Sequence, residues 1–69
     1  MNYLQDQYTT VVDAVKHSPD LPFETTIWAR SHDDAGALEQ MLGDALKDRA
    51  LVDVVSDDGH WGVWVRATA

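Results

Sequence analysis

The stretch that decides the fold is LVDVVSDDGHWGVWVR, residues 51–66, which predicts a β-hairpin closed at Asp58-Gly59. Asp-Gly is one of the preferred pairs for a two-residue turn between antiparallel strands. A two-residue turn produces one largely apolar face, on which Ser56 pairs with Trp61, Val54 with Val63, and Val52 with Val65. A three-residue turn would instead set Asp53 against Val63, which is less favourable for burial. We therefore expect the two-residue turn.

A third strand is predicted at FETTIWAR, residues 23–30. Its residues alternate as in a half-buried strand, so that Phe23 and Ile27 point to one face and Trp28 to the other. Trp61 belongs to the apolar face of the hairpin and is predicted to enter the core. The opposite face of the hairpin, which we expect beside Trp28, carries Leu51, Asp53, Trp64 and Arg66.

Two helices are predicted from apolar residues at helical spacing. Residues 2–17 form the first, which ends before Pro19 and Pro22 because proline cannot continue a helix. Residues 32–48 form the second, for which Ser31 is a suitable N-cap. The two apolar stripes consist of Leu4, Tyr8, Val11, Val12 and Val15 in the first helix and of Ala35, Leu38, Met41, Leu42, Ala45 and Leu46 in the second.

The predicted order of elements is helix, strand, helix, strand, strand, within one small α+β domain that spans residues 1–69. A strand–helix–strand unit crosses over right-handed, and the last strand has a natural partner on each side. We therefore expect a three-stranded antiparallel sheet in the order first, third, second, packed on a helix. This is a split β-α-β-β unit, half of a ferredoxin-like fold, preceded by an N-terminal helix. Both outer strands then have an open edge, through which the chain could form a homodimer.

The position of the first helix decides whether Trp28 and Trp64 are exposed. If this helix folds back over the sheet, its apolar residues cover both tryptophans. If it packs beside the second helix, both tryptophans stay in solvent with arginines around them, as in a protein-binding hot spot. The sequence leaves the two arrangements open.

The composition favours a soluble, intracellular protein. The 69 residues include 12 acidic and 5 basic side chains, for a net charge of −7, and no cysteine. A small chain without cysteine is typical of a reducing compartment, and the N-terminus has neither the basic start nor the apolar run of a signal peptide. No stretch approaches the length of a membrane span, so we expect a cytoplasmic location without membrane contact.

The net charge also bears on the partner. Direct nucleic-acid binding is disfavoured, because phosphate contacts need clustered Lys and Arg. An acidic protein instead associates faster with a protein that has a basic surface. The same charge is also typical of an ordinary solvated surface, so by itself it does not identify a partner.

Six potential metal ligands are expected at one end of the sheet: His32, Asp33, Asp34, Asp57, Asp58 and His60. Histidine and carboxylate groups can hold a divalent metal, but the spacing matches no calcium loop. Each residue also has a structural reason for its position, at a helix start, a turn or a strand start. A catalytic pocket is not indicated, because nothing in the pattern would move the pKa values of paired carboxylates apart. We therefore predict no metal, no cofactor and no enzymatic activity.

The run FETTIWARSHDDAGALEQMLGDALKDRALVDVVSDDGHWGVWVRATA, residues 23–69, resembles the domain of the RNase E inhibitor B (RraB-like) family. The shared pattern is an aromatic-led strand, a short acidic step, an Ala/Leu helix, a Val-rich strand, an acidic-Gly turn and a final strand with tryptophan. The resemblance implies an acidic, ferredoxin-like, non-enzymatic protein that inhibits an RNA-degrading enzyme by binding it. The shorter stretch FETTIWARSHDDA, residues 23–35, is similar in style to phage-encoded inhibitors of host RNA polymerase. Small acidic αβ chains of this kind also include anti-CRISPR proteins that mimic DNA.

Three functions follow as hypotheses. The leading one is a small acidic protein that binds and inhibits a nucleic-acid-processing enzyme, such as a ribonuclease, an RNA polymerase or a CRISPR-type nuclease, with nucleic-acid mimicry as one mechanism. The residues expected to contact this partner are Trp28, Trp64, Asp33, Asp34, Asp53, Asp57 and Asp58. The alternative is a structural or dimerisation module that acts through its open sheet edges. A third hypothesis is a small metal-dependent hydrolase that uses His32, His60 and the nearby aspartates.

Overall fold

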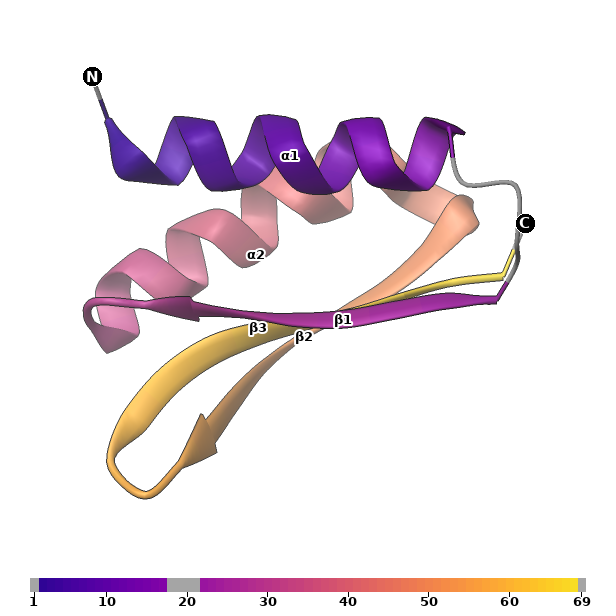
Figure 1. The fold of residues 1–69 in the computed structure, drawn as a ribbon. Helices are drawn as coiled ribbons and strands as arrows, with labels where there is room; N and C mark the ends of the chain where they lie inside the picture. Colours follow the sequence, from indigo (N-terminus) through magenta and orange to yellow (C-terminus); the bar gives the residue numbers. More distant parts are fainter. Residues whose placement is uncertain (1, 18–21, 69) are drawn as a thin grey trace.

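The computed structural model describes residues 2–17 and 22–68 and contains the predicted elements in the predicted order (Figure 1). These elements are α1 (Tyr3–His17), β1 (Phe23–Ala29), α2 (His32–Leu46), the short 3-10 helix η1 (Lys47–Arg49), β2 (Ala50–Asp57) and β3 (His60–Ala67). Pro19, one of the residues expected to end the first helix, lies outside the described residues. Within the described ranges, no helix is both long enough and apolar enough to cross a membrane.

The sheet confirms the predicted order and register. Its three strands are antiparallel and lie in the order β1-β3-β2, so the last strand is central. Asp58 and Gly59 close the hairpin with positive φ angles of 52° and 81°, as a two-residue hairpin turn requires. The hairpin pairs include Ser56 with Trp61, Val54 with Val63, Val52 with Val65, Asp53 with Trp64 and Leu51 with Arg66.

Both helices lie on the same side of the sheet (Figure 1). The second helix, α2, contacts all three strands, and α1 packs beside α2 and against β1. The core between these layers is entirely apolar. It consists of Val11, Val12 and Val15 from α1, Ala35, Leu38, Leu42 and Leu46 from α2, and Val63, Val65 and Ala67 from β3. Removal of this apolar surface from water is the main driving force for a fold of this size.

The ends of α2 follow from local chemistry. The Ser31 hydroxyl accepts a hydrogen bond from the backbone N–H of Asp34 at 3.1 Å, which confirms the predicted N-cap. The helix is shorter than residues 32–48, because Lys47 takes a positive φ of 47° and the chain continues as η1. With φ 47° and ψ −122°, Lys47 is outside the α-helical region, so the α-helix ends there.

The prediction for Trp61 is correct in its face but wrong in its burial. The side chain lies on the helix-covered face, in the row with Ala29 and Ser56, yet it is 36% exposed. This row lies at the start of α2, where the apolar stripe has not yet begun. The Trp61 ring instead contacts the His32 ring edge-on, with the ring centroids 4.5 Å apart and the planes at 68°. The first turn of α2 is therefore too polar to enclose this tryptophan.

Candidate protein-binding face

No element among the described residues covers the face of the sheet that points away from the helices, and we call it the open face. Burial alternates along β1, with every second residue exposed, as expected when only one face is packed. The residues of the open face are Glu24, Thr26 and Trp28 from β1, Leu51, Asp53, Val55 and Asp57 from β2, and His60, Gly62, Trp64 and Arg66 from β3. Since α1 packs beside α2, the arrangement in which Trp28 and Trp64 stay uncovered by the first helix is the one observed.

Trp28 lies over Gly62 on the open face. The two residues are direct partners in the ladder between β1 and β3, and Val55 pairs with Gly62 from the other side. A Cβ atom at position 62 would come within 2.8 Å of Trp28 Cε3, so the indole ring fills the space that a side chain would need. Gly62 is buried as a result. An aromatic ring that covers a glycine on the neighbouring strand helps to fix the register of a sheet.

Trp64 is held in place by a carboxylate. Its indole Nε1–H donates a hydrogen bond of 2.6 Å to Glu24 Oε2 on β1. Its direct neighbours in the sheet are Thr26 on one side and Asp53 on the other. The ring is half-buried, so it presents part of its surface to solvent while its polar atom is satisfied.

Two apolar side chains of the open face are strongly exposed. Leu51 is 62% exposed and Trp28 is 47% exposed, at opposite ends of the face. Trp64 lies in the row between them. A run of aromatic and aliphatic groups that neither helix covers is typical of an interaction surface.

Three of the predicted partner-binding aspartates are on this side of the molecule. Asp53 is exposed on β2 beside Trp64. Asp57 ends β2, and Asp58 follows in the turn. Asp57 and Asp58, together with His60 and Trp28, line a hollow of about 380 Å³ at the turn end of the open face. Trp28 and two of the predicted partner-binding aspartates therefore line the same hollow.

The other two predicted aspartates lie elsewhere, in the first turn of α2. Asp34 accepts a hydrogen bond from the Tyr3 hydroxyl. Asp33 is fully exposed, with its carboxylate 3.9 Å from the His32 ring nitrogen Nδ1. Neither residue is on the open face, and neither lines the hollow at the turn. Their first role is local, since carboxylates favour the N-terminal turn of a helix.

The six potential metal ligands are not brought together as expected. His32 contacts Trp61 on the helix-covered face, whereas Asp57 and His60 belong to the open face. The sheet itself separates the two groups. Among residues 2–17 and 22–68 no group of three or more His, Asp or Glu side chains is placed to hold a metal ion.

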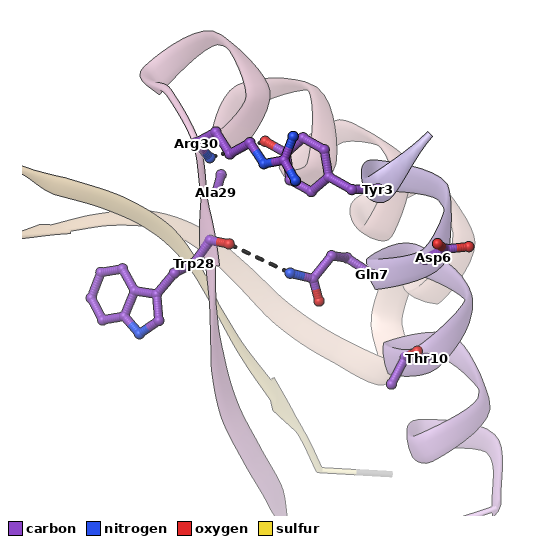
Figure 2. A pocket seen from close by; sticks show the side chains of 7 residues that line it. All are labelled: Tyr3, Asp6, Gln7, Thr10, Trp28, Ala29 and Arg30. Atoms are coloured by element: carbon purple, nitrogen blue, oxygen red, sulfur yellow. Dashed lines mark hydrogen bonds between the residues drawn. The ribbon is translucent and has the colours of Figure 1, made fainter. Parts of the chain in front are cut away.

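A second hollow, of about 400 Å³, lies between the first part of α1 and the end of β1 (Figure 2). It is lined by Tyr3, Asp6, Gln7, Thr10, Trp28, Ala29 and Arg30. Figure 2 shows that Trp28 turns its backbone carbonyl towards α1, while its indole ring points away from this helix. The ring therefore belongs to the open face and not to the groove beside α1.

Three residues at this groove tie α1 to the rest of the fold, and we call them the Tyr3 clasp: Tyr3, Arg30 and Asp34. The Tyr3 hydroxyl donates to the Asp34 carboxylate and accepts a hydrogen bond of 2.9 Å from the Arg30 backbone N–H. The Arg30 guanidinium lies 4.2 Å from the centroid of the Tyr3 ring, within cation–π distance. Partial burial, together with the adjacent Asp34, raises the pKa of Tyr3 above its ordinary value of 10.0.

At each outer edge of the sheet, a helix side chain forms a hydrogen bond with a backbone group of the edge strand. The Trp28 carbonyl accepts a hydrogen bond of 3.4 Å from Gln7 Nε2 at the β1 edge. The Val54 N–H donates a hydrogen bond of 3.2 Å to Glu39 Oε2 at the β2 edge. A strand from another chain would have to displace these contacts, so the edges are less available for pairing than bare edge strands.

Sequence reasoning named Trp28 and Trp64 as partner-binding residues but did not include Leu51, Gly62 and Glu24 in the site. The register already set Leu51 opposite Arg66 on the face away from the core, so its exposure could have been read from the pairing. A glycine inside an apolar strand is a signal for close approach of another group, and here that group is Trp28. The bond from Trp64 to Glu24 had no sequence signal.

A scan against protein-family models, a search of curated proteins and a search of solved structures give no match to this chain. The resemblance to the RNase E inhibitor B family therefore stays a prediction. Function has to be argued from the open face and its charge.

Proposed function

We propose that this chain is a small acidic protein-binding module that engages a basic surface of its partner through the open face. The observation that carries the proposal is the exposure of Leu51 and Trp28, at 62% and 47%, on a sheet face that neither helix covers. Exposed apolar groups with polar groups around them are typical of a protein interface.

The charge supports a basic partner. The chain has a net charge of −7, and acidic side chains of the open face lie next to its apolar anchors. Asp53 neighbours Trp64, and Asp57 shares a hollow with Trp28. Opposite charges around an apolar centre speed association and exclude partners with the wrong charge.

Large basic surfaces are typical of enzymes that process nucleic acids, because these enzymes bind a phosphate backbone. We therefore propose such an enzyme as the partner and inhibition as the effect, since an acidic protein seated on that surface competes with the nucleic acid. The resemblance to the RNase E inhibitor B family and to phage-encoded inhibitors supports the same direction. The mechanism needs no catalytic residue and no cofactor in this chain.

The test is affinity capture from the native cell with paired variants. A face variant, Leu51→Ser with Asp53→Asn, alters one anchor and one charge of the open face. A control variant, Gln40→Ser with Asp13→Asn, introduces the same two side chains, serine and asparagine, at exposed helix positions. We expect the parent and the control to retain a basic nucleic-acid-processing enzyme and to inhibit it in a purified assay, whereas the face variant does neither.

Salt gives a second readout of the same proposal. Binding between an acidic face and a basic surface should weaken steeply as ionic strength rises, because the charges are exposed and screened. Affinity that stays constant between low and high salt would contradict the basic partner. Equal capture by the face variant and the control would contradict the open face as the site.

The alternative is a dimerisation module, which we predicted to act through the open sheet edges and which could also act through the open face. The specific observation in its favour is the uncovered apolar area, which a second copy could also occupy. The hydrogen bonds at the sheet edges and the net charge of each copy oppose it. Light scattering at high protein concentration distinguishes the two functions, since a dimer that dissociates in the face variant but not in the control would support the alternative.

A further inference from the structure

The hollow at the turn end of the open face combines an aromatic wall with two carboxylates. Its lining residues are Trp28 from β1, Asp57 from the end of β2, Asp58 from the turn and His60 from the start of β3. The volume of about 380 Å³ leaves room for the end of a side chain from another molecule. Asp57, Asp58 and His60 belong to one hairpin turn, and the register between β1 and β3 brings Trp28 beside them.

The aromatic wall is held in position independently of the acids. The Trp28 ring lies against Gly62, where a Cβ atom would meet Cε3 at 2.8 Å and Cζ3 at 3.2 Å. Its indole points away from α1 (Figure 2), so that helix does not cover it. With 47% of its surface exposed, the ring offers part of its surface to the hollow.

The two carboxylates are also carried by a defined backbone. Asp57 pairs with His60 as the last rung of the hairpin ladder. Asp58 adopts a left-handed conformation with φ 52°, followed by Gly59 at φ 81°. Within residues 2–17 and 22–68, no ion pair joins Asp57 or Asp58 to a basic side chain, so both charges are free to meet a ligand.

We propose that this hollow binds the guanidinium group of an arginine side chain from the partner protein. A planar guanidinium stacks on an indole through cation–π attraction and at the same time donates paired hydrogen bonds to carboxylates. The inference depends on the proposed function, because it names the group of the basic partner that inserts. Arginine is favoured over lysine since an ammonium group cannot stack as a plane and cannot bond in a fork.

The test uses Nα-acetyl-arginine amide as the probe and the neutral isostere Nα-acetyl-citrulline amide as its control. Binding is followed by NMR through the indole N–H signals of the three tryptophans, assigned with single Trp→Phe variants. We expect the arginine probe to shift the Trp28 signal in a saturable manner and to leave Trp61 unchanged, because Trp61 is on the other face. The citrulline probe should produce no such shift.

Paired variants separate the hollow from general attraction to an acidic protein. Asp57→Asn with Asp58→Asn neutralises the hollow, and asparagine still accepts the left-handed conformation that the turn needs. Asp13→Asn with Asp44→Asn removes the same charge from exposed helix positions. We expect the first variant to lose about tenfold in affinity for the arginine probe and the second to stay within about twofold.

Either of two results would overturn the proposal. One is equal weakening by both double variants, which would mean that only net charge matters. The other is equal binding of citrulline and arginine, which would mean that the indole alone attracts the probe. Circular dichroism and thermal unfolding of each variant establish that the fold is intact before the comparison is made.

The failure of this inference can be told apart from failure of the proposed function. If a captured partner still binds the Asp57→Asn, Asp58→Asn variant but not the Leu51→Ser, Asp53→Asn variant, the open face is the site and the arginine hollow is wrong. If the arginine probe binds as expected but no basic protein depends on the open face, the hollow stands and the proposed function is wrong.

Discussion

Replacement of Gly62 by alanine tests how the open face is built. The new Cβ atom would lie 2.8 Å from Trp28 Cε3 and 2.9 Å from the Ile27 carbonyl oxygen, whereas ordinary contacts begin at 3.4 Å. Even the more distant of these atoms would have to retreat by about half an ångström (3.4 − 2.9 = 0.5 Å). The Trp28 ring can swing because it is partly exposed. The carbonyl cannot move alone, because it is part of the backbone of β1, which is paired with β3.

The expected cost follows from two opposing effects. Overpacking a well-filled position costs about 1–3 kcal/mol of stability. Alanine recovers about 0.5–1 kcal/mol of this, because glycine loses more backbone entropy on folding. We therefore expect Gly62→Ala to lower the free energy of unfolding by about 1–2 kcal/mol, with the melting temperature of a domain of this size falling by about 4–8 °C per kcal/mol.

The assay is urea unfolding followed by far-UV circular dichroism, which does not depend on the perturbed tryptophan. The same substitution in a Trp28→Ala background should cost less, because the contact with the ring is gone and only the carbonyl contact remains. A Gly62→Ala protein as stable as the parent would refute the reasoning. So would an equal cost in both backgrounds, since the ring would then not be what excludes a side chain at position 62.

Four further outcomes are expected. Leu42→Ala, at a fully buried position of α2, should lower the free energy of unfolding by about 2–5 kcal/mol in urea. Ser31→Ala removes the cap of the same helix and should cost about 1 kcal/mol in the same assay. The pKa of Tyr3 is raised in the folded protein, so the stability that this hydroxyl contributes is complete below about pH 10 and is lost as pH rises through the folded pKa. Tyr3→Phe should therefore reduce the fall in the free energy of unfolding at alkaline pH, measured by urea unfolding across that range. Glu39→Ala frees the Val54 N–H at the β2 edge and should increase self-association in light scattering, and an unchanged monomer would show that this edge is protected by other means.

The fold was predictable because the turn residues and the pairing of apolar residues across the strands indicated the same structure. Asp58-Gly59 fixed the turn, and the turn fixed the register of every pair in the hairpin. The alternation of residues 23–30 then assigned the faces of the remaining strand. The position of α1 had no such signal, since its apolar stripe could have covered either the second helix or the open face.

The site was predictable only in part, for physical reasons that particular residues illustrate. Trp28 and Trp64 were assigned to the right face because strand periodicity is strict. Burial of Trp61 was mispredicted, because it depends on how far the apolar stripe of α2 extends over the sheet. Asp34 was grouped with the other acids because it follows the end of the first strand, at the same end of the sheet, whereas its contact with Tyr3 comes from a helix whose placement the sequence left open.

Because helices cover only one face of the sheet, alternate residues of a strand lie in the core and on the open face. In β3, Val63 and Val65 are fully buried in the core, whereas Trp64 and Arg66 alternate with them and lie on the open face. Exposed side chains such as Leu51 and Asp53 can therefore change with little effect on the core, whereas Gly62 with Trp28, and Trp64 with Glu24, also support the sheet. If the partner changes during evolution, exposed residues of the open face could therefore be substituted one at a time while the protein stays folded.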